Sequence, residues 1–161
     1  MSATEKDLII KLPYRVGFWM IHADDTAGFF DDKVERARLK AVIERIAKHH
    51  ESSGFVRNAL ANTLAHEDKW SEWAGGLDNI FKDCKAALQM VKAQSAHEDL
   101  QLYRVVIMQT AVCVAEAFQE DPNVPDLTGL TFATANDPGI PENISKKEKM
   151  ALEELKKVLW G

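Results

Sequence analysis

Apolar residues recur along this chain at the three- and four-residue spacing of amphipathic helices, and no alternating run is long enough to predict a sheet. The clearest stripes cover 32–50, 55–64, 77–91 and 145–159. Between Ser95 and about residue 120 the chain is apolar on almost every side of a helix. Because such a helix belongs in the middle of a bundle, the pattern predicts an all-α bundle around this buried helix.

Sequence signals for helix starts divide the chain further. A capping box places Ser or Asp before a helix and Glu three residues later, so that each side chain bonds the other residue's backbone N–H. Four such pairs occur, Ser2 with Glu5, Asp32 with Glu35, Ser95 with Glu98, and Ser145 with Glu148. Proline disrupts a helix interior, so Pro13 predicts two short helices, 6–12 and 14–23. The total is about seven helices.

Two parts of the chain, about 13–50 and 98–160, follow the same plan. Each has an apolar helix that runs into acidic residues, then a loop, then a helix opened by a capping box. Counted from the box glutamate, apolar residues stand at +4, +7 and +11 in both, namely Leu39, Val42 and Ile46 in the first and Leu152, Leu155 and Leu159 in the second. This correspondence predicts an internal pseudo-twofold duplication of a helix–acidic loop–helix unit.

The acidic residues of the two units are the candidate metal ligands. The first set is Asp24, Asp25, Asp32 and Glu35, and the second is Glu120, Asp121 and Glu148. Clustered carboxylates repel one another, and a hard divalent cation such as Ca²⁺ or Mg²⁺ relieves that repulsion. The second set is the weaker candidate, since more than 20 residues separate Asp121 from Glu148.

A simpler interpretation of the acids stays open. The span 24–35 has the length of an EF-hand loop, but Thr26, Gly28 and Phe29 stand where that loop needs oxygen ligands and a sixth-position glycine. The same carboxylates would also serve as helix caps, as favourable charges at a helix N-terminus, and as turn residues. On that interpretation no metal binds.

Other chemistry is poorly supported by the sequence. The His-Glu pairs at 50–51, 66–67 and 97–98 lack both the Glu-x-x-His spacing of di-iron bundles and the His-Glu-x-x-His spacing of zincins. No nucleophile elbow and no phosphate-binding glycine loop occurs. Cys84 and Cys113 lie in apolar helical patterns, which is typical of reduced core cysteines.

Composition narrows the class of protein. The chain has 161 residues with 46% apolar residues, which suits one domain over 1–161 with a real core. The formal charge is −5, from 20 basic and 25 acidic residues, and the basic ones are scattered. We therefore expect no nucleic-acid surface, and no apolar stretch approaches the roughly 20 residues of a membrane span. The N-terminus resembles no secretory signal, so we expect a cytoplasmic protein.

The repeated unit resembles the TerB-like family of tellurite-resistance and stress-associated proteins. The stretch from Met20 to Asp25 resembles that family's apolar helix ending in Ala-Asp-Gly, with Asp25 in the glycine's place. The pair Asp32 and Glu35 resembles the start of its next helix, whereas the later copy carries a long proline-rich insertion between Asp121 and Ser145. The resemblance implies an all-α domain whose acidic residues bind divalent metal, without established catalysis.

Three hypotheses follow. The leading one is a non-catalytic, cytoplasmic TerB-like protein that binds a divalent cation and serves protein partners in a stress response. The second is a partner-binding helical scaffold whose acids only cap helices. The third is an enzyme or small-ligand carrier with a pocket under the 122–144 loop, which gains support if His22, His66 or His97 meets a carboxylate in one cleft.

Overall fold

The computed structural model describes residues 3–23, 32–117, 140 and 144–161, and this part of the chain contains helices and no strand. The all-α prediction is therefore confirmed. Its helices are α1 (Ala3–Ile21), α2 (Asp32–His49), α3 (Gly54–Ala65), α4 (Trp70–Trp73), α5 (Ile80–Gln94), α6 (His97–Ala117) and α7 (Lys146–Trp160), with single 3₁₀ turns at Glu67–Lys69 and Leu77–Asn79.

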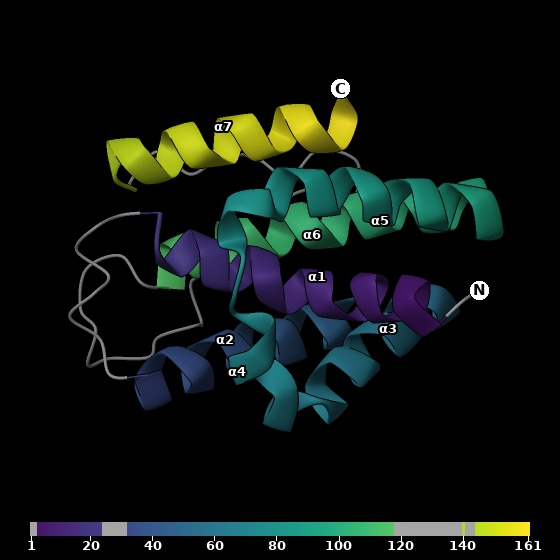
Figure 1. Cartoon of the computed structure of the whole chain (residues 1–161), viewed down its shortest axis with the longest axis horizontal. Coiled ribbons are helices and arrows are strands. Elements are labelled where there is room, and N and C mark those ends of the chain that lie inside the picture. Colours follow the sequence, from purple (N-terminus) through teal and green to yellow (C-terminus); the bar gives the residue numbers. More distant parts are fainter. Residues whose placement is uncertain (1–2, 24–31, 118–139, 141–143) are drawn as a thin grey trace.

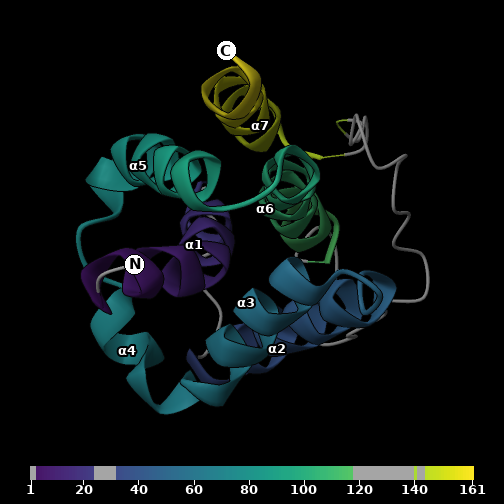
Figure 2. The ribbon, with the colours of Figure 1, turned by 90° about the vertical axis from the view of Figure 1, so that its right-hand side faces the viewer.

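Helices α1 and α6 form the middle of the bundle. Figure 1 shows α7 above α5 and α6, and α2, α3 and α4 below α1. Seen along the bundle, α1 and α6 lie between the α5–α7 side and the α2–α3–α4 side (Figure 2). Every residue from Val105 to Ala115 in α6 is buried, which confirms the prediction of a buried central helix.

The repeated positions of the two predicted units are buried alike. The six apolar side chains at +4, +7 and +11 from the box glutamates have exposures of 0–1%, and they are Leu39, Val42, Ile46, Leu152, Leu155 and Leu159. Helices α2 and α7 thus use the same register to pack on the core. That agreement is what a duplication would produce, but any amphipathic helix with this spacing would also show it, and the duplication stays a prediction.

The prediction that Pro13 divides the first helix is wrong, because α1 continues through Pro13 to Ile21. Proline has no N–H to donate to the carbonyl four residues earlier, which is that of Ile9. The hydroxyl of Tyr103 in α6 donates to this carbonyl instead, at 2.8 Å. The next carbonyl, of Ile10, accepts from the Thr63 hydroxyl of α3 at 2.6 Å. Other helices therefore supply the bonds that make the proline tolerable.

The segment around Trp70 and Trp73 forms the one-turn helix α4. Buried Arg15 of α1 holds it by donating to the backbone oxygens of Trp73, Gly75 and Gly76, of which the first is 2.7 Å away. The same guanidinium lies 2.9 Å from Asp83 Oδ2 of α5. One charged side chain thus fixes α4 and the turn after it to α1.

Two of the predicted capping boxes can be compared with the structure. The Ser145–Glu148 box is confirmed, since each side chain bonds the other residue's backbone N–H at 3.1 Å. The Ser95–Glu98 box places the start of α6 one residue too early. The Ala96 carbonyl accepts from Leu100 N–H at 3.2 Å, and Ser95 instead caps the end of α5. Only Ser95 and Ala96 link α5 to α6, and from the sequence either residue could precede the first turn of α6.

We predict that Tyr103→Phe lowers the free energy of unfolding by about 1–3 kcal/mol, because the Ile9 carbonyl then stays buried without its donor. The control is the same change in a Pro13→Ala background, where residue 13 regains an N–H for that carbonyl. Urea unfolding of the four proteins measures the coupling. An equal cost of Tyr103→Phe in both backgrounds would contradict this account.

We predict that Gly17→Ala also destabilises the protein. A Cβ at Gly17 overlaps Leu39 Cδ1 of α2 and approaches Thr110 Cγ2 of α6 to 3.4 Å. Overpacking of this kind costs about 1–3 kcal/mol, and the better helix propensity of alanine returns only about 1 kcal/mol of it. The matched control is Gly54→Ala, whose Cβ meets no atom within 4 Å. Calorimetric melting that shows equal effects for both variants would refute the close contact.

Candidate functional site

Most of the predicted metal ligands lie outside the described residues, namely Asp24, Asp25, Glu120 and Asp121. Asp32 is the first residue of α2, but its side chain also lies outside the described part. Only Glu35 of the first set and Glu148 of the second can be located in full. Both are buried, with exposures of 5% and 8%.

Glu148 has a structural task. Its carboxylate oxygen accepts from the Ser145 backbone N–H at 3.1 Å and closes the capping box of α7. The negative charge also lies in the first turn of the helix, where the backbone dipole favours it. This position therefore fits the simpler interpretation of a capping acid.

Glu35 lies in a different setting, on the wall of a cavity of about 250 Å³ between α1, α2 and α4. One of its carboxylate oxygens is 3.9 Å from Nε2 of His22, at the end of α1. The His22 side chain is 41% exposed, so this pair lies where the cavity region meets solvent. A buried carboxylate thus faces a cavity that has access to water.

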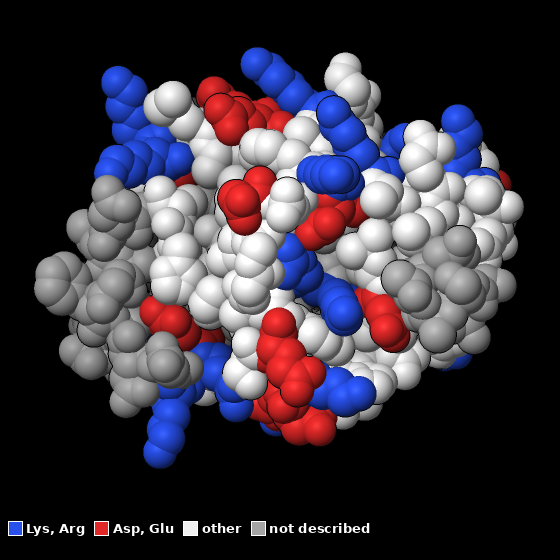
Figure 3. Space-filling view, viewed as in Figure 1, with Lys and Arg blue, Asp and Glu red and all other residues white. Residues whose placement is uncertain are grey.

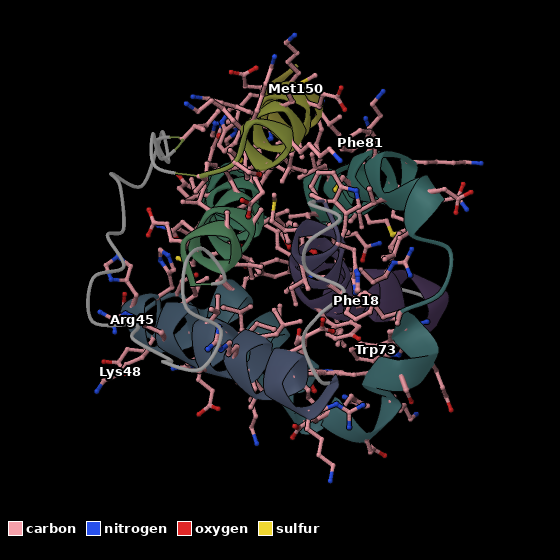
Figure 4. All side chains as sticks on the ribbon, turned by 90° about the vertical axis from the view of Figure 1, so that its left-hand side faces the viewer. Phe18, Arg45, Lys48, Trp73, Phe81 and Met150 are labelled. Atoms are coloured by element: carbon pink, nitrogen blue, oxygen red, sulfur yellow. The ribbon has the colours of Figure 1, made fainter. Side chains whose placement is uncertain are left out.

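The α1 wall of the cavity is aromatic. Tyr14 and Phe18 line it, and with His22 they follow a spacing of four residues, which puts all three on one side of the helix. The Phe18 ring lies 5.7 Å from that of Tyr14 and 4.5 Å from that of His22. Tyr14 also stacks on Trp70, with ring centroids 4.8 Å apart. Figure 4 labels Phe18, from α1, and Trp73, from α4.

The remaining walls combine a small apolar floor with a polar rim. Leu39 of α2 and Ala74 after α4 are apolar, while Arg36 and Ser71 are exposed at the edge. Such a cavity can hold a small molecule with an apolar body and a polar end. The i, i+4, i+8 ridge of Tyr14, Phe18 and His22 was readable in the sequence. The cavity could not be read from the sequence, because its third wall comes from α4, which is distant from α1 and α2 in the chain.

Of the three histidines named as possible site residues, His66 meets the condition set for the third hypothesis, a histidine and a carboxylate in one cleft. His66 lines a separate hollow of about 210 Å³ with Asp7 and Glu72, and its Nδ1 bonds the Asn62 carbonyl oxygen at 2.7 Å. His97 is exposed at the start of α6. His22 Nε2 approaches the carboxylate of Glu35 to 3.9 Å. Within the described residues, no three His, Cys, Asp or Glu side chains are grouped as a metal site requires.

The predicted pocket under the 122–144 loop can be judged only in part, since most of that loop lies outside the described residues. Ile140 borders an open hollow of about 380 Å³ against α7, together with Trp160, Lys156 and Lys157. The walls of this hollow include no histidine and no cysteine. Its described walls also include the carboxylate of Glu153.

The two cysteines are poor nucleophiles. Both are free thiols in the core. Burial, followed by the charge of Asp83, raises the pKa of Cys84 to about 12. Burial, followed by the charge of Glu116, raises the pKa of Cys113 to about 12 as well. The thiolate is the reactive form, so these cysteines belong to the core, as the sequence predicts.

Two features of the described residues bear on charge and on membrane spans, the distribution of charged side chains and the length of the apolar helices. Figure 3 shows acidic and basic side chains interspersed on the face in view, without a continuous basic patch over its described residues. No helix in the described part of the chain is both long enough and apolar enough to cross a membrane.

One histidine is buried for structural reasons. His50 is 8% exposed at the end of α2, and its Nε2 lies 2.8 Å from Gln109 Oε1 of α6. Desolvation lowers the pKa of His50 below 6.5, against the opposing effect of the Gln109 bond, and nearby His49 adds to the lowering. The folded protein therefore favours the neutral imidazole at this position.

We predict a loss of stability in acid that depends on His50. Above pH 6.5 the imidazole is neutral in both states. As the pH falls below 6.5, the unfolded chain binds a proton that folded His50 resists, so stability drops until the pH passes the lower folded pKa. Urea unfolding at pH 7.5 and 5.5 should show a smaller drop in His50→Gln than in the native protein. Exposed His97→Gln is the control, and equal drops in all three proteins would refute the assignment.

Comparison of the chain with models of protein families, with curated proteins and with solved structures finds no match. The resemblance to TerB-like proteins therefore rests on the short motifs of the repeated unit.

Proposed function

We propose that this is a non-catalytic, TerB-like helical protein of the cytoplasm that binds a divalent cation, Ca²⁺ or Mg²⁺, at the head of α2. Asp24, Asp25, Asp32 and Glu35 would supply the oxygen ligands. Binding would signal to protein partners in a response to tellurite or another chemical stress. This role for the acids is the one that the resemblance implies.

The observation that carries the proposal is the position of Glu35. Its carboxylate is only 5% exposed, lies one turn after the first residue of α2, and faces a cavity instead of the bulk solvent. Moving a carboxylate out of water is costly, and a cation beside it offsets that cost. A divalent cation at the head of α2 would add to the polar partners that Glu35 already has, of which His22 Nε2 lies 3.9 Å away.

For the second set of acids, the structure favours the alternative function of a scaffold. Glu148 is engaged in the capping box of α7, so one of its oxygens already accepts a backbone hydrogen bond. We therefore limit the proposed cation site to the first set. On this proposal, Glu120, Asp121 and Glu148 contribute to folding or to partner binding.

We predict that Ca²⁺, Mg²⁺ or Mn²⁺ added to metal-stripped protein releases or absorbs heat and raises the melting temperature. A ligand that binds only the folded state stabilises it by about 2.7 kcal/mol at one hundred times its dissociation constant. Glu35→Gln should weaken the binding at least about tenfold, because it removes a charged oxygen ligand. Isothermal titration calorimetry and thermal melting measure both effects.

The control is Glu44→Gln on the exposed side of α2, which changes the net charge equally and should bind the cation as the native protein does. Absence of heat and of a melting shift at millimolar cation would eliminate the cation proposal. So would equal weakening by the two substitutions, since it would indicate a diffuse effect of charge.

A further inference from the structure

We infer that the hollow beside His66 is a binding site for a small free amino acid, a molecule that carries both an ammonium group and a carboxylate. The carboxylates of Asp7 and Glu72 would pair with the ammonium group, and Lys11 and Lys69 would pair with the carboxylate. The hollow shares no lining residue with the cavity that Glu35 borders, so the inference does not rest on the proposed cation site.

The hollow has charged residues of both signs on each of two walls. Asp7 and Lys11 belong to the first half of α1, whereas Lys69 and Glu72 belong to the segment that follows α3. Figure 1 shows α3 and α4 on the same side of α1. A small molecule between the two walls therefore meets an acid and a base from each of them.

The four charged side chains are available to a ligand. Asp7 and Lys11 are four residues apart and Lys69 and Glu72 are three apart, which are spacings at which charged helical residues can pair with each other. Within the described part of the chain, however, none of the four side chains forms a salt bridge or a hydrogen bond. Their charges thus have no partner in the protein.

The mixture of signs disfavours a ligand that carries one kind of charge only. An anion would pair with the two lysines but would also lie beside two carboxylates, and a cation would meet the reverse. Like charges repel as strongly as opposite charges attract at the same distance. A molecule with an ammonium group and a carboxylate a few bonds apart can place each group beside an opposite charge.

His66 adds a directed hydrogen-bond acceptor. Its Nδ1 lies 2.7 Å from the carbonyl oxygen of Asn62, and a carbonyl only accepts, so Nδ1 carries the hydrogen. In the neutral ring Nε2 then has the lone pair, and among the described residues nothing donates to it. The backbone bond orients the ring before any ligand arrives, which lowers the cost of ordering it on binding. This nitrogen is suited to accept from an ammonium N–H.

The size of the ligand follows from the volume. A hollow of about 210 Å³ corresponds to roughly seven water molecules at the volume of liquid water, about 30 Å³ each. Ile10 and Trp73 supply the apolar part of the lining, which suits a short aliphatic side chain. Alanine matches these requirements, whereas a peptide of several residues is too large.

The test uses the full chain in the presence of a chelator, so that its result does not depend on a divalent cation. The probes are alanine, alanine methyl ester, which keeps only the ammonium charge, and N-acetylalanine, which keeps only the carboxylate. Amide chemical shifts in NMR titrations give the dissociation constant of each probe and the residues that respond. We expect alanine to bind at least about threefold more tightly than either analogue, since an exposed ion pair contributes only a few-fold to affinity.

The acids are tested by Asp7→Asn combined with Glu72→Gln, which keeps the shape of both side chains. This variant should lose the preference for alanine over N-acetylalanine, because the ammonium group no longer meets a carboxylate. The matched control is Asp68→Asn combined with Asp78→Asn, which changes the net charge equally at exposed positions outside the hollow. It should leave all three dissociation constants unchanged.

The lysines are tested by Lys11→Met combined with Lys69→Met. This variant should lose the preference for alanine over its methyl ester, because the carboxylate no longer meets an ammonium group. The control is Lys82→Met combined with Lys85→Met, at exposed positions of α5. Since the substituted side chains of the hollow are exposed or half-buried, both variants should fold.

Equal binding of the three probes by the native protein would overturn the inference. Tighter binding of either analogue would also overturn it and would indicate that the hollow receives the end of a peptide. So would a preference that survives the substitutions, shifts that spare residues 7–11 and 66–73, or the absence of any shift at about 100 mM alanine. A failure to detect divalent-cation binding would eliminate only the proposed function.

Discussion

The arrangement of the bundle depends on a backbone carbonyl that its own helix cannot satisfy. Pro13 deprives the Ile9 carbonyl of its donor in the middle of α1, and Tyr103 of α6 supplies the bond. Burial raises the pKa of Tyr103 well above its usual value, so the hydroxyl keeps its proton. Because an unpaired buried carbonyl is costly, the correct docking of α1 on α6 is coupled to the integrity of α1 itself.

The cavity between α1, α2 and α4 depends on contacts that α1 makes with α4 and α2, in addition to its docking on α6. Arg15 is one residue from Tyr14, and it draws the backbone after α4 towards α1 while Tyr14 stacks on Trp70. Gly17, three residues after Tyr14, lets Leu39 of α2 approach α1 closely. Tyr14, Arg15 and Gly17 of α1 thus set its distances to α4 and α2. The space between the three helices is the cavity that Glu35 lines.

The sequence predicts what depends on local order and fails where distant residues decide. The stripes from Leu39 to Ile46 and from Leu152 to Leu159 follow from helical periodicity, and the Ser145 box from contacts three residues apart. The continuity of α1 through Pro13 depends on the hydrogen bond from Tyr103 to the Ile9 carbonyl. Tyr103 lies ninety residues beyond Pro13, so local helix propensity could not predict this bond. For the same reason the sequence identifies Glu35 as a candidate but not its aromatic surroundings, since α1 and α4 meet through the bonds of Arg15 and the stacking of Tyr14 on Trp70, more than fifty residues apart in the chain.

The two buried thiols make the opening of this bundle observable without any label. Cys84 belongs to α5 and Cys113 to α6, and burial raises the pKa of each to about 12, so both thiols stay protonated in the native protein. An alkylating reagent therefore reacts chiefly with molecules in which the surrounding helix has come away from the core. Matching modification rates at the two sites would mean that α5 and α6 separate in one cooperative event, and unequal rates would reveal which helix leaves first.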